Sequence, residues 1–214
     1  MKLLAIIPSY NHGLHLQRVV KDIKSYCTDI LVVDDGSTDI TKNLKPTNAF
    51  LIRHSRNRGK GAALKTGFGF AIHKGYDAVL TIDSDGQHKA YDIPQFIKAA
   101  QQYDLIIGSR MHNVRNMPLR RRMANSLSSF IVSILSGQYI ADSQSGFRLI
   151  KTKLLRQIHL TNNGYQLETE IILKAARKGF KIGSVPIETI YGKEASHINP
   201  VTVCFRFLKT LIQR

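Results

Sequence analysis

The stretch Asp83-Ser84-Asp85-Gly86-Gln87-His88 follows a short apolar run, residues 76–82, which is bounded by polar residues. Such a run predicts a buried β-strand, so two carboxylates one residue apart leave a strand end and enter a turn. Two like charges this close are costly unless they share a cation or hydrogen-bond donors. Mg²⁺ typically takes one or two carboxylates plus substrate phosphates, and Gln87 adds a neutral oxygen. A solvated Asp-Gly turn is the alternative interpretation, because Asp, Ser and Gly are ordinary turn residues.

Strands and helices are predicted to alternate along the first half of the chain. Short apolar runs predict strands, and apolar residues at helical spacing predict helices. The predicted strands are residues 3–7, 30–33, 49–53, 76–82 and 105–107, and the predicted helices are residues 14–26, 62–73 and 93–103. This order is typical of βαβ units. It predicts an α/β fold with a mostly parallel sheet that helices cover on both faces.

The second half of the chain is less regular. It is predicted to contain a basic stretch at 111–123, a helix at 127–135, a polar loop at 137–146, a helix at 167–178, two short strands at 181–185 and 187–191 broken at Pro186, and a basic amphipathic helix at 201–214. Glu168 and Glu170 lie two positions apart on a predicted helix, so they point to different faces and at most one is expected in a site. No repeat or linker is visible, which favours one domain over residues 1–214.

Four of the predicted strands end in polar motifs. These are Ser9-Tyr10-Asn11, Asp34-Asp35-Gly36-Ser37, Asp83 to His88, and Gly108-Ser109-Arg110. In open α/β sheets, ligands bind in the crevice beyond the carboxyl ends of the strands. One acidic turn is ordinary, but four polar strand ends, two of them with paired carboxylates, indicate a shared site. The position of Asp83 and Asp85 therefore favours a metal site over a solvated turn.

The chain is strongly basic, with 31 Lys and Arg against 15 Asp and Glu and a formal net charge of +16. Such an excess indicates an anionic partner, which could be nucleic acid, an anionic membrane surface or a phosphorylated substrate. The sequence has no basic-aromatic RNA-binding signature and no recognition-helix motif, so nucleic acid is not the expected partner. A nucleic-acid-binding module would also leave the acidic strand ends unexplained.

The cellular location is expected to be cytoplasmic. The N-terminal apolar run is too short for a signal peptide, and no stretch approaches the ~18 apolar residues that cross a membrane. Cys27 and Cys204 lack metal-ligand spacing and are expected to be buried free thiols. Peripheral association with the inner face of a membrane stays open, because residues 201–214 combine apolar and basic side chains as interfacial helices do. Covering the core of its own domain is the alternative role for that helix.

Seven motifs, taken in order, carry a family resemblance. They are Ile7-Pro8-Ser9-Tyr10-Asn11, Val33-Asp34-Asp35-Gly36-Ser37-Thr38-Asp39, Asn57-Arg58-Gly59-Lys60-Gly61, Asp83 to His88, Gly108-Ser109-Arg110, Asp142-Ser143-Gln144-Ser145-Gly146-Phe147-Arg148 and Ser196-His197-Ile198-Asn199-Pro200. The chain resembles the inverting GT-A glycosyltransferases of family 2, and most of all the dolichyl- or polyprenyl-phosphate sugar synthases of the dolichyl-phosphate mannosyltransferase type. The resemblance implies a GT-A fold, which is Rossmann-like, with a nucleotide-sugar-binding half at 1–110 and an acceptor-binding half at 111–214.

The resemblance also implies a metal-dependent donor site. It assigns the nucleotide-sugar (a GDP- or UDP-sugar) to Pro8, Tyr10, Asn11, Asp34, Asp35, Lys60, Asp83, Ser84 and Asp85. Asp83, Asp85 and Gln87 match the DxD-type motif and would hold Mg²⁺ or Mn²⁺ against the donor diphosphate. His12 stands where the family pattern has an acid. A solvated lysine in a Gly-rich turn is the alternative interpretation of Lys60.

The acceptor side is expected to bind a lipid phosphate. By resemblance, Arg110, Arg122 and Ser126 would hold that phosphate, and Arg120 or Arg121 could replace Arg122. Three consecutive arginines can equally form a solvated surface. Residues 191–197 resemble a loop that closes over donor and metal, where His197 would touch the diphosphate or cap the last helix.

A phosphate acceptor is already ionised, whereas a hydroxyl acceptor needs a general base. Asp142 is the candidate base, with hydrogen bonding within its own loop as the alternative role. The expected catalytic residues are therefore Asp85, Arg110 and Asp142. The expected activity is inverting transfer of a sugar from a nucleotide-sugar to a polyprenyl phosphate. Transfer to a saccharide or another hydroxyl acceptor by the same fold is the alternative, and a non-catalytic scaffold is disfavoured by the intact Asp83 and Asp85.

Overall fold

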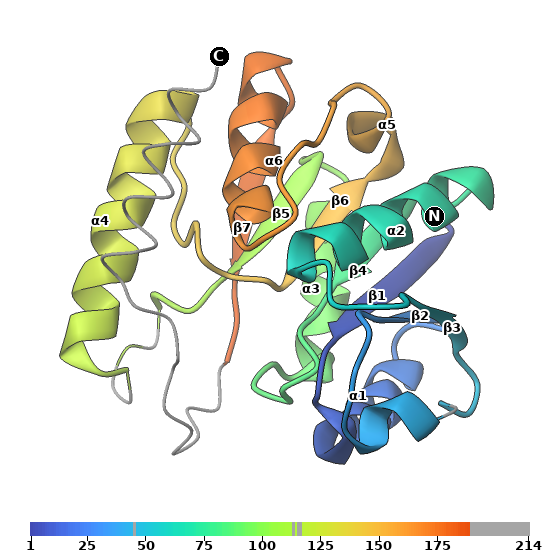
Figure 1. The fold of residues 1–214 in the computed structure, drawn as a ribbon. Helices are drawn as coiled ribbons and strands as arrows, with labels where there is room; N and C mark the ends of the chain where they lie inside the picture. The colour runs from blue at the N-terminus through green and yellow to red at the C-terminus, as the bar shows by residue number, and fades with distance from the viewer. Residues whose placement is uncertain (45, 113, 115–116, 189–214) are drawn as a thin grey trace.

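The computed structural model describes residues 1–44, 46–112, 114 and 117–188 (Figure 1). Its centre is a seven-stranded sheet with the order β3-β2-β1-β4-β6-β5-β7. The strands are β1 (Leu3–Ser9), β2 (Asp29–Asp34), β3 (Phe50–Arg53), β4 (Ala78–Thr81), β5 (Leu105–Ser109), β6 (Arg148–Lys151) and β7 (Ile182–Pro186). All neighbouring strands pair in parallel except β6, which is antiparallel to both β4 and β5. The predicted α/β fold with a mostly parallel sheet is confirmed.

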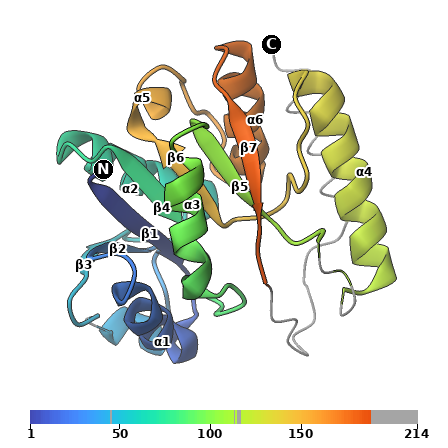
Figure 2. The same ribbon diagram turned by 180° about the vertical axis from the view of Figure 1, so that it is seen from behind.

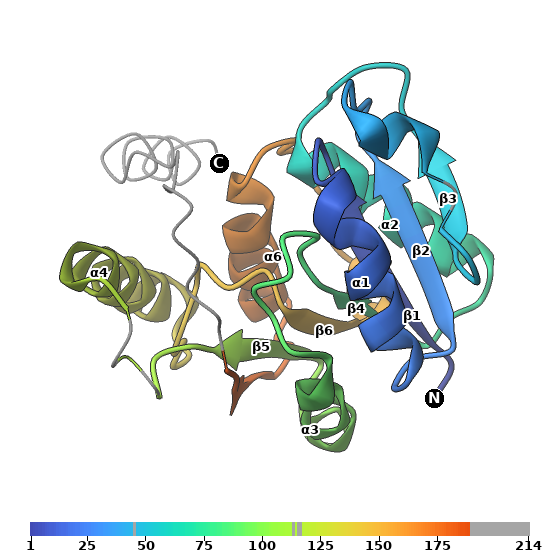
Figure 3. The same ribbon diagram turned by 90° about the horizontal axis from the view of Figure 1, so that it is seen from below.

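Helices cover both faces of the sheet (Figure 2, Figure 3). They are α1 (Gly13–Lys24), α2 (Lys60–His73), α3 (Ile93–Ala99), α4 (Leu119–Ser136), α5 (Thr152–Leu155) and α6 (Gln166–Arg177), with short 3₁₀ turns at Ile40–Asn43 and Ala90–Asp92. Side chains alternate across the sheet, so Leu4 and Ile6 of β1 belong to one core and Ala5 and Ile7 to the other. The first core packs against α2, α5 and α6, and the second against α1 and α3.

Strand β6 was not predicted from the sequence. It follows directly on the motif that begins at Asp142, and its short run of Arg148, Leu149, Ile150 and Lys151 carries charge at both ends. Because β6 lies between β4 and β5, it separates two strands that would be neighbours in a purely parallel sheet. Strands β4 and β5 nevertheless point the same way, since both are antiparallel to β6, so their carboxyl ends share one edge.

Helix α4 begins at Leu119, eight residues before the predicted start at residue 127. The predicted start follows from apolar spacing, and the arginines at positions 120–122 interrupt that spacing in the first two turns of the helix. These arginines therefore lie on a helix rather than in a loop. The helix ends at Gly137, whose positive φ of 65° is the left-handed conformation that commonly ends helices.

The end of the described chain differs from the prediction in one respect. Strand β7 runs through Pro186, which an edge strand tolerates, and Ile187 and Glu188 are not in a strand, contrary to the predicted second strand at 187–191.

Cys27 is a buried free thiol, as expected. No helix within the described residues is long and apolar enough to cross a membrane. Several predictions fall outside the described residues, namely those for the loop at 191–197, His197, the helix at 201–214 and Cys204.

Candidate active site

The polar motifs that end β1, β2, β4 and β5 lie along one edge of the sheet, because these strands all point in the same direction. In the register of β1 and β2, Ser9 is opposite Asp34. The Asp35 backbone N–H then donates to the Ser9 carbonyl at 2.8 Å, which joins the two strand ends beyond the sheet. The four motifs thus lie at one edge of the sheet, as their positions at strand ends predicted, and a site shared by all four remains a prediction.

Asn11 joins the first strand end to the turn that follows β2. Its side-chain Oδ1 accepts from the Thr38 backbone N–H at 2.9 Å, and its own backbone N–H donates to Ser37 Oγ at 3.0 Å. Asn11 holds a positive φ of 56°, a conformation that Asn tolerates better than most residues. Pro8 is buried and Tyr10 is 40% exposed. Tyr10 and Asn11 are both exposed, but Asn11 is held by the turn after β2, so the Tyr10 side chain is the freer of the two to meet a ligand.

Asp34 and Asp35 are both fully buried and both engaged within the protein. Asp34 accepts from Arg53 Nε at 2.6 Å and from the Ser37 backbone N–H at 3.0 Å. Gly36, between this pair and Ser37, has a φ of 75°, and a Cβ there would lie 2.4 Å from the Arg56 backbone carbon. Only glycine therefore lets the turn pack against residues 56–57.

Asp35 fixes the glycine-rich loop at 57–61. Its carboxylate accepts from the backbone N–H groups of Arg58 and Gly59, at 3.1 and 2.7 Å, and contacts His54 Nδ1 at 2.6 Å. The other ring nitrogen of His54 contacts Thr66 Oγ1 of α2 at 2.9 Å. His54 was missed at the sequence level, since a single histidine after a strand carries no motif. Nucleotide binding by Asp34 and Asp35 remains a prediction. The contacts described above show that the two carboxylates hold the turn at 36–37 and the loop at 57–61 in place.

Lys60, the first residue of α2, reaches the Asp83 carboxylate. Its Nζ lies 2.6 Å from Asp83 Oδ1 and 2.9 Å from Glu168 Oε1 of α6. Burial alone would lower the pKa of Lys60, but the two carboxylates outweigh it and raise that pKa above its usual value. Burial would likewise raise the pKa of Asp83, and the Lys60 charge holds it below the usual range. Lys60 is thus an ion-paired, largely buried cation, so the alternative interpretation of a solvated lysine does not hold. Nucleotide-sugar binding by Lys60 remains a prediction.

Glu168 and Glu170 point to different partners, as their spacing predicted. Glu168 reaches Lys60, whereas Glu170 accepts from the backbone N–H groups of Thr161 and Asn162, both at 2.9 Å. Glu170 therefore anchors the loop before α6 and stays outside the site.

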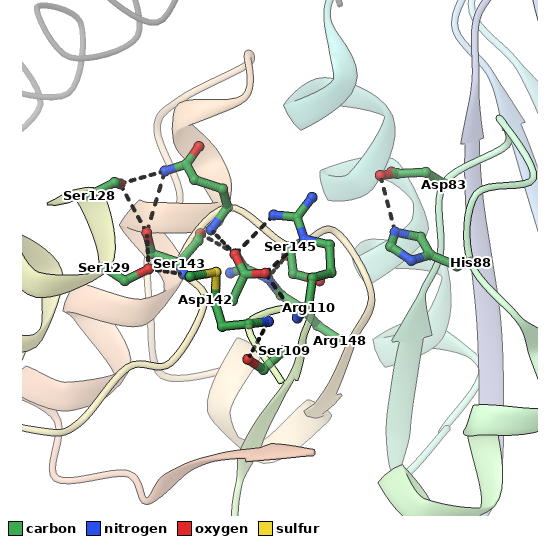
Figure 4. Close-up of polar contacts among 12 residues, drawn as sticks. Asp83, His88, Ser109, Arg110, Ser128, Ser129, Asp142, Ser143, Ser145 and Arg148 are labelled. Atoms are coloured by element: carbon green, nitrogen blue, oxygen red, sulfur yellow. Dashed lines mark hydrogen bonds and ion pairs between the residues drawn. The ribbon is translucent and has the colours of Figure 1, made fainter. Parts of the chain in front are cut away.

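The remaining residues of the acidic turn follow Asp83 along the chain. Asp85 Oδ1 accepts from the Gln87 backbone N–H at 3.0 Å, and Ser84 is buried. His88 Nε2 lies 3.9 Å from Asp83 Oδ2 (Figure 4). The His88 ring packs against Phe147. The buried His88 Nδ1 has no hydrogen-bond partner within the described residues. Burial lowers the pKa of His88, so its ring is neutral near pH 7.

The residue types at Asp83, Asp85 and Gln87 suit a divalent cation, and metal binding by these residues remains a prediction. The Lys60 ammonium already places a positive charge 2.6 Å from Asp83 Oδ1, which shows that this carboxylate faces a position suited to a cation. Across the described part of the chain, no three His, Cys, Asp or Glu side chains converge into a metal cage. Mg²⁺ and similar cations are commonly held by one or two carboxylates, and substrate phosphates complete their coordination. These ligand residues therefore suit a metal that binds together with a phosphorylated substrate.

Arg110 and Asp142 form a two-point ion pair beyond the end of β5 (Figure 4). Arg110 Nε and Nη2 donate to the two Asp142 oxygens at 2.7 and 2.9 Å, and the Arg110 backbone N–H adds a third bond at 3.2 Å. Asp142 is fully buried, which would raise its pKa, but the Arg110 hydrogen bonds and charge hold that pKa below its usual value. The carboxylate is therefore a weak base that orients Arg110. A catalytic role for Asp142 stays a prediction.

Arg148 holds the loop that carries Asp142. Its guanidinium is buried and donates to the backbone carbonyls of Ser143 and Ser145 at 2.8 and 2.7 Å, and to that of Glu168. The motif that ends in Arg148 therefore ties the loop at 142–146 to α6. This role was not predicted, because an arginine in a polar motif is more often expected to meet a ligand.

Helix α4 carries two of the three predicted acceptor residues on its surface. Arg122 and Ser126 are exposed and four residues apart, so they lie on one side of the helix on successive turns. Beside Ser126, a groove of about 570 Å³ runs between α4 and the loop at 137–141. Met111, Phe130, Ile134 and Tyr139 give the groove an apolar lining.

Solved structures share this architecture. Glucosyl-3-phosphoglycerate synthase from Mycobacterium tuberculosis, solved with Mn²⁺, uridine diphosphate and phosphoglyceric acid, superposes with a TM-score of 0.72 at 17% identity and covers 99% of this chain and 76% of its own. At this identity the similarity shows the fold alone, and the expected GT-A fold is confirmed. The profile of Glycosyl transferase family 2 matches residues 4–181, and the chain belongs to that family of enzymes.

Curated relatives are closer in sequence. The UDP-N-acetylglucosamine–dolichyl-phosphate N-acetylglucosaminyltransferase of Methanococcus voltae is 34% identical over 87% of this chain and 84% of its own length. The undecaprenyl-phosphate mannosyltransferase of Micrococcus luteus is 31% identical over 87% of this chain and 83% of its own. The polyprenol monophosphomannose synthase of Mycolicibacterium smegmatis is 32% identical over 86% and 76%. The resemblance to polyprenyl-phosphate sugar transferases is thus confirmed.

Proposed function

We propose that this protein transfers a sugar, with inversion, from a nucleotide-sugar to a polyprenyl phosphate. The observation that carries the proposal is the Arg110–Asp142 pair, in which both carboxylate oxygens are occupied by the guanidinium. A carboxylate held in this way is poorly suited to deprotonating a hydroxyl, whereas a phosphate oxygen attacks without a strong base. Relatives named for transfer to dolichyl, undecaprenyl and polyprenol phosphates support the same acceptor.

The donor would be a GDP- or UDP-sugar bound across the ends of β1, β2 and β4. Tyr10 offers an exposed ring to the base, and the turn that Asn11 and Asp34 stabilise offers backbone groups to the ribose. Asp83, Asp85 and Gln87 would hold Mg²⁺ or Mn²⁺ against the diphosphate. When bound, the metal supplies Lewis-acid neutralisation of the departing nucleoside diphosphate. Lys60 would add a further positive charge on the same side.

The acceptor phosphate would lie between Arg110 at the end of β5 and Arg122 with Ser126 on α4. Asp142 fixes the Arg110 guanidinium, so that a phosphate meets an oriented donor group rather than a flexible side chain. The apolar groove that starts at Ser126 suits the isoprenoid chain attached to that phosphate.

We further propose that α4 is the surface that contacts an anionic membrane. Five large apolar side chains spaced three or four residues apart are more than half exposed, namely Leu119, Met123, Leu127, Phe130 and Ile134. Together they form an apolar stripe on the side of α4 opposite its buried residues. The exposed Arg120 and Arg122 flank the stripe, and the whole chain carries a net charge of +16. Apolar side chains beside cationic ones are the combination that binds anionic lipid surfaces, where a polyprenyl phosphate resides.

A transfer assay tests the proposed activity. The protein is incubated with Mn²⁺, a panel of GDP- and UDP-sugars and a short polyprenyl phosphate, and release of nucleoside diphosphate is measured together with the glycosylated lipid. The proposal predicts release that depends on the lipid phosphate and disappears when the corresponding polyprenol is supplied instead. Release only with a saccharide acceptor would replace the lipid acceptor by a hydroxyl acceptor, and no turnover with any donor would reject the enzyme.

A further inference from the structure

Lys60 bridges two carboxylates that come from distant parts of the chain. Its Nζ lies 2.6 Å from Asp83 Oδ1, beyond β4, and 2.9 Å from Glu168 Oε1 on α6. The three side chains are 17%, 26% and 10% exposed respectively, so the ion pairs are largely shielded from water and from salt screening. An ammonium group has three donors and no acceptor, which suits it to sharing between two carboxylates.

The surrounding backbone is built to fit this cluster. Gly146 packs against it so closely that a Cβ there would lie 2.6 Å from Asp83 Oδ2 and 2.9 Å from Lys60 Nζ. Thr81 Oγ1 at the end of β4 donates to the Gly146 carbonyl at 2.8 Å and holds the segment in place. The Lys60 ion pairs are therefore a defined feature of the site, unlike the flexible lysine pairs of an exposed surface.

Asp83 is also the first of the three residues predicted to bind the metal. From this overlap we infer that the Lys60 ammonium is the internal counter-ion of the metal site, which a divalent cation displaces from Asp83 while Glu168 retains it. A cation within bonding distance of Asp83 Oδ1 and an ammonium 2.6 Å from the same oxygen repel each other strongly, so the two compete for it. Glu168 is then a positioning residue, because its carboxylate still holds the Lys60 ammonium after the metal has displaced that ammonium from Asp83.

Competition between Lys60 and the metal for Asp83 couples metal binding to binding of the nucleotide-sugar. The cation alone brings two positive charges to a cluster that Lys60 has already partly neutralised. A nucleoside diphosphate brings the negative charge that offsets both cations, so metal and donor are expected to strengthen each other's binding. The inference rests on the proposed function for the metal ligands and adds the reason that the metal would bind weakly before the donor.

The test measures Mn²⁺ binding by electron paramagnetic resonance, with neither donor nor acceptor present. Lys60→Met removes the competing charge and should tighten Mn²⁺ binding roughly tenfold or more relative to the wild type. Glu168→Gln leaves the lysine with Asp83 alone and removes one negative charge, so it should weaken Mn²⁺ binding. Lys65→Met is the matched control on the same helix, since the Lys65 ammonium donates to the Thr161 carbonyl, and it should leave the affinity unchanged. Asp83→Asn added to Lys60→Met should abolish the gain.

The inference predicts opposite changes in Mn²⁺ affinity for the two variants, tighter binding by Lys60→Met and weaker binding by Glu168→Gln. Unchanged or weaker Mn²⁺ binding by a folded Lys60→Met protein would overturn the inference, as would tighter binding by Glu168→Gln. If Lys60→Met does not fold, the direction of the Glu168→Gln shift still decides. Tighter binding by Lys60→Met in a protein that transfers no sugar would uphold the counter-ion and reject the proposed function. Sugar transfer by the wild type together with unchanged Mn²⁺ binding by Lys60→Met would uphold the proposed function and reject the counter-ion.

Discussion

Arg110 holds Asp142 by two parallel hydrogen bonds, 2.7 and 2.9 Å long, and its backbone N–H binds the same carboxylate at 3.2 Å. The side chains are 11% and 0% exposed, so both charges have left water. A buried ion pair of this kind gives little net stability, but removal of one partner leaves the other charge uncompensated. The pair is therefore a device that fixes the orientation of Arg110 at the predicted acceptor side.

Asp142→Asn should destabilise the protein by about 3 kcal/mol, because the largely buried Arg110 guanidinium loses the negative charge that Asp142 places against it. Urea denaturation at pH 7 measures the change in the free energy of unfolding. Asp22→Asn is the control, since Asp22 pairs with Arg18 at 3.8 Å on an exposed helix face and should change stability by less than about 0.5 kcal/mol. Equal effects of the two substitutions would contradict the role given to the buried pair.

Asp85→Asn should reduce sugar transfer roughly a hundredfold or more, since it removes a carboxylate from the predicted metal ligands at a site where charge stabilisation dominates catalysis. Removal of divalent metal with a chelator should reduce wild-type transfer similarly, and added Mn²⁺ should restore it. Transfer rates are measured by nucleoside diphosphate release. A wild-type rate in the Asp85→Asn protein would remove Asp85 from the metal site.

The sequence predicted the edge of the sheet at which the polar motifs lie better than it predicted the contacts that each residue makes. Apolar strands that run into polar motifs are visible in the sequence, because strand ends and ligand sites coincide in parallel α/β folds. The partners of Asp34 and Asp35 are not visible in the same way. Arg53 and His54 lie 19 residues along the chain from these acids and reach them only after β2 and β3 have paired. Asp34 and Asp35, which were predicted to bind the nucleotide-sugar, are thus held by contacts within the protein itself.

The same limit applies to Lys60 and Glu168, which meet only because α2 and α6 lie on one face of the sheet. Strand β6 escaped prediction for a related reason. Its four residues are too short to show a period, and its place between β4 and β5 depends on pairing in three dimensions. The local spacing of apolar residues thus predicted the order of strands and helices. The contacts around the predicted ligand residues depend on segments that are distant in the chain, so they were not predicted.

Glu170 should make stability depend on pH in the acid range. Burial would raise its pKa, but Lys174 and the N–H groups of Thr161 and Asn162 lower it from 4.5 to about 2. A folded-state pKa below the unfolded one gives stability that is present above pH 4.5 and is lost as the pH falls towards 2. Glu170→Gln should therefore cost on the order of 3 kcal/mol at pH 7 and almost nothing at pH 2. Urea denaturation of both proteins at these two pH values measures the difference, and an equal cost at both would contradict the assignment.

The apolar stripe on α4 should be required for membrane binding and dispensable for folding. Met123 and Leu127 are 65% and 57% exposed, so the double substitution Met123→Asp and Leu127→Asp removes apolar surface and adds negative charge where lipid contact is proposed. Partitioning onto vesicles that contain phosphatidylglycerol should fall roughly a hundredfold, with the melting temperature almost unchanged. Ile97→Asp on α3 is the control, because Ile97 is 39% exposed on the other face of the sheet and should bind vesicles as the wild type does. Wild-type binding by the α4 variant would assign membrane contact to another surface, and equal loss in both variants would indicate a general effect of added negative charge.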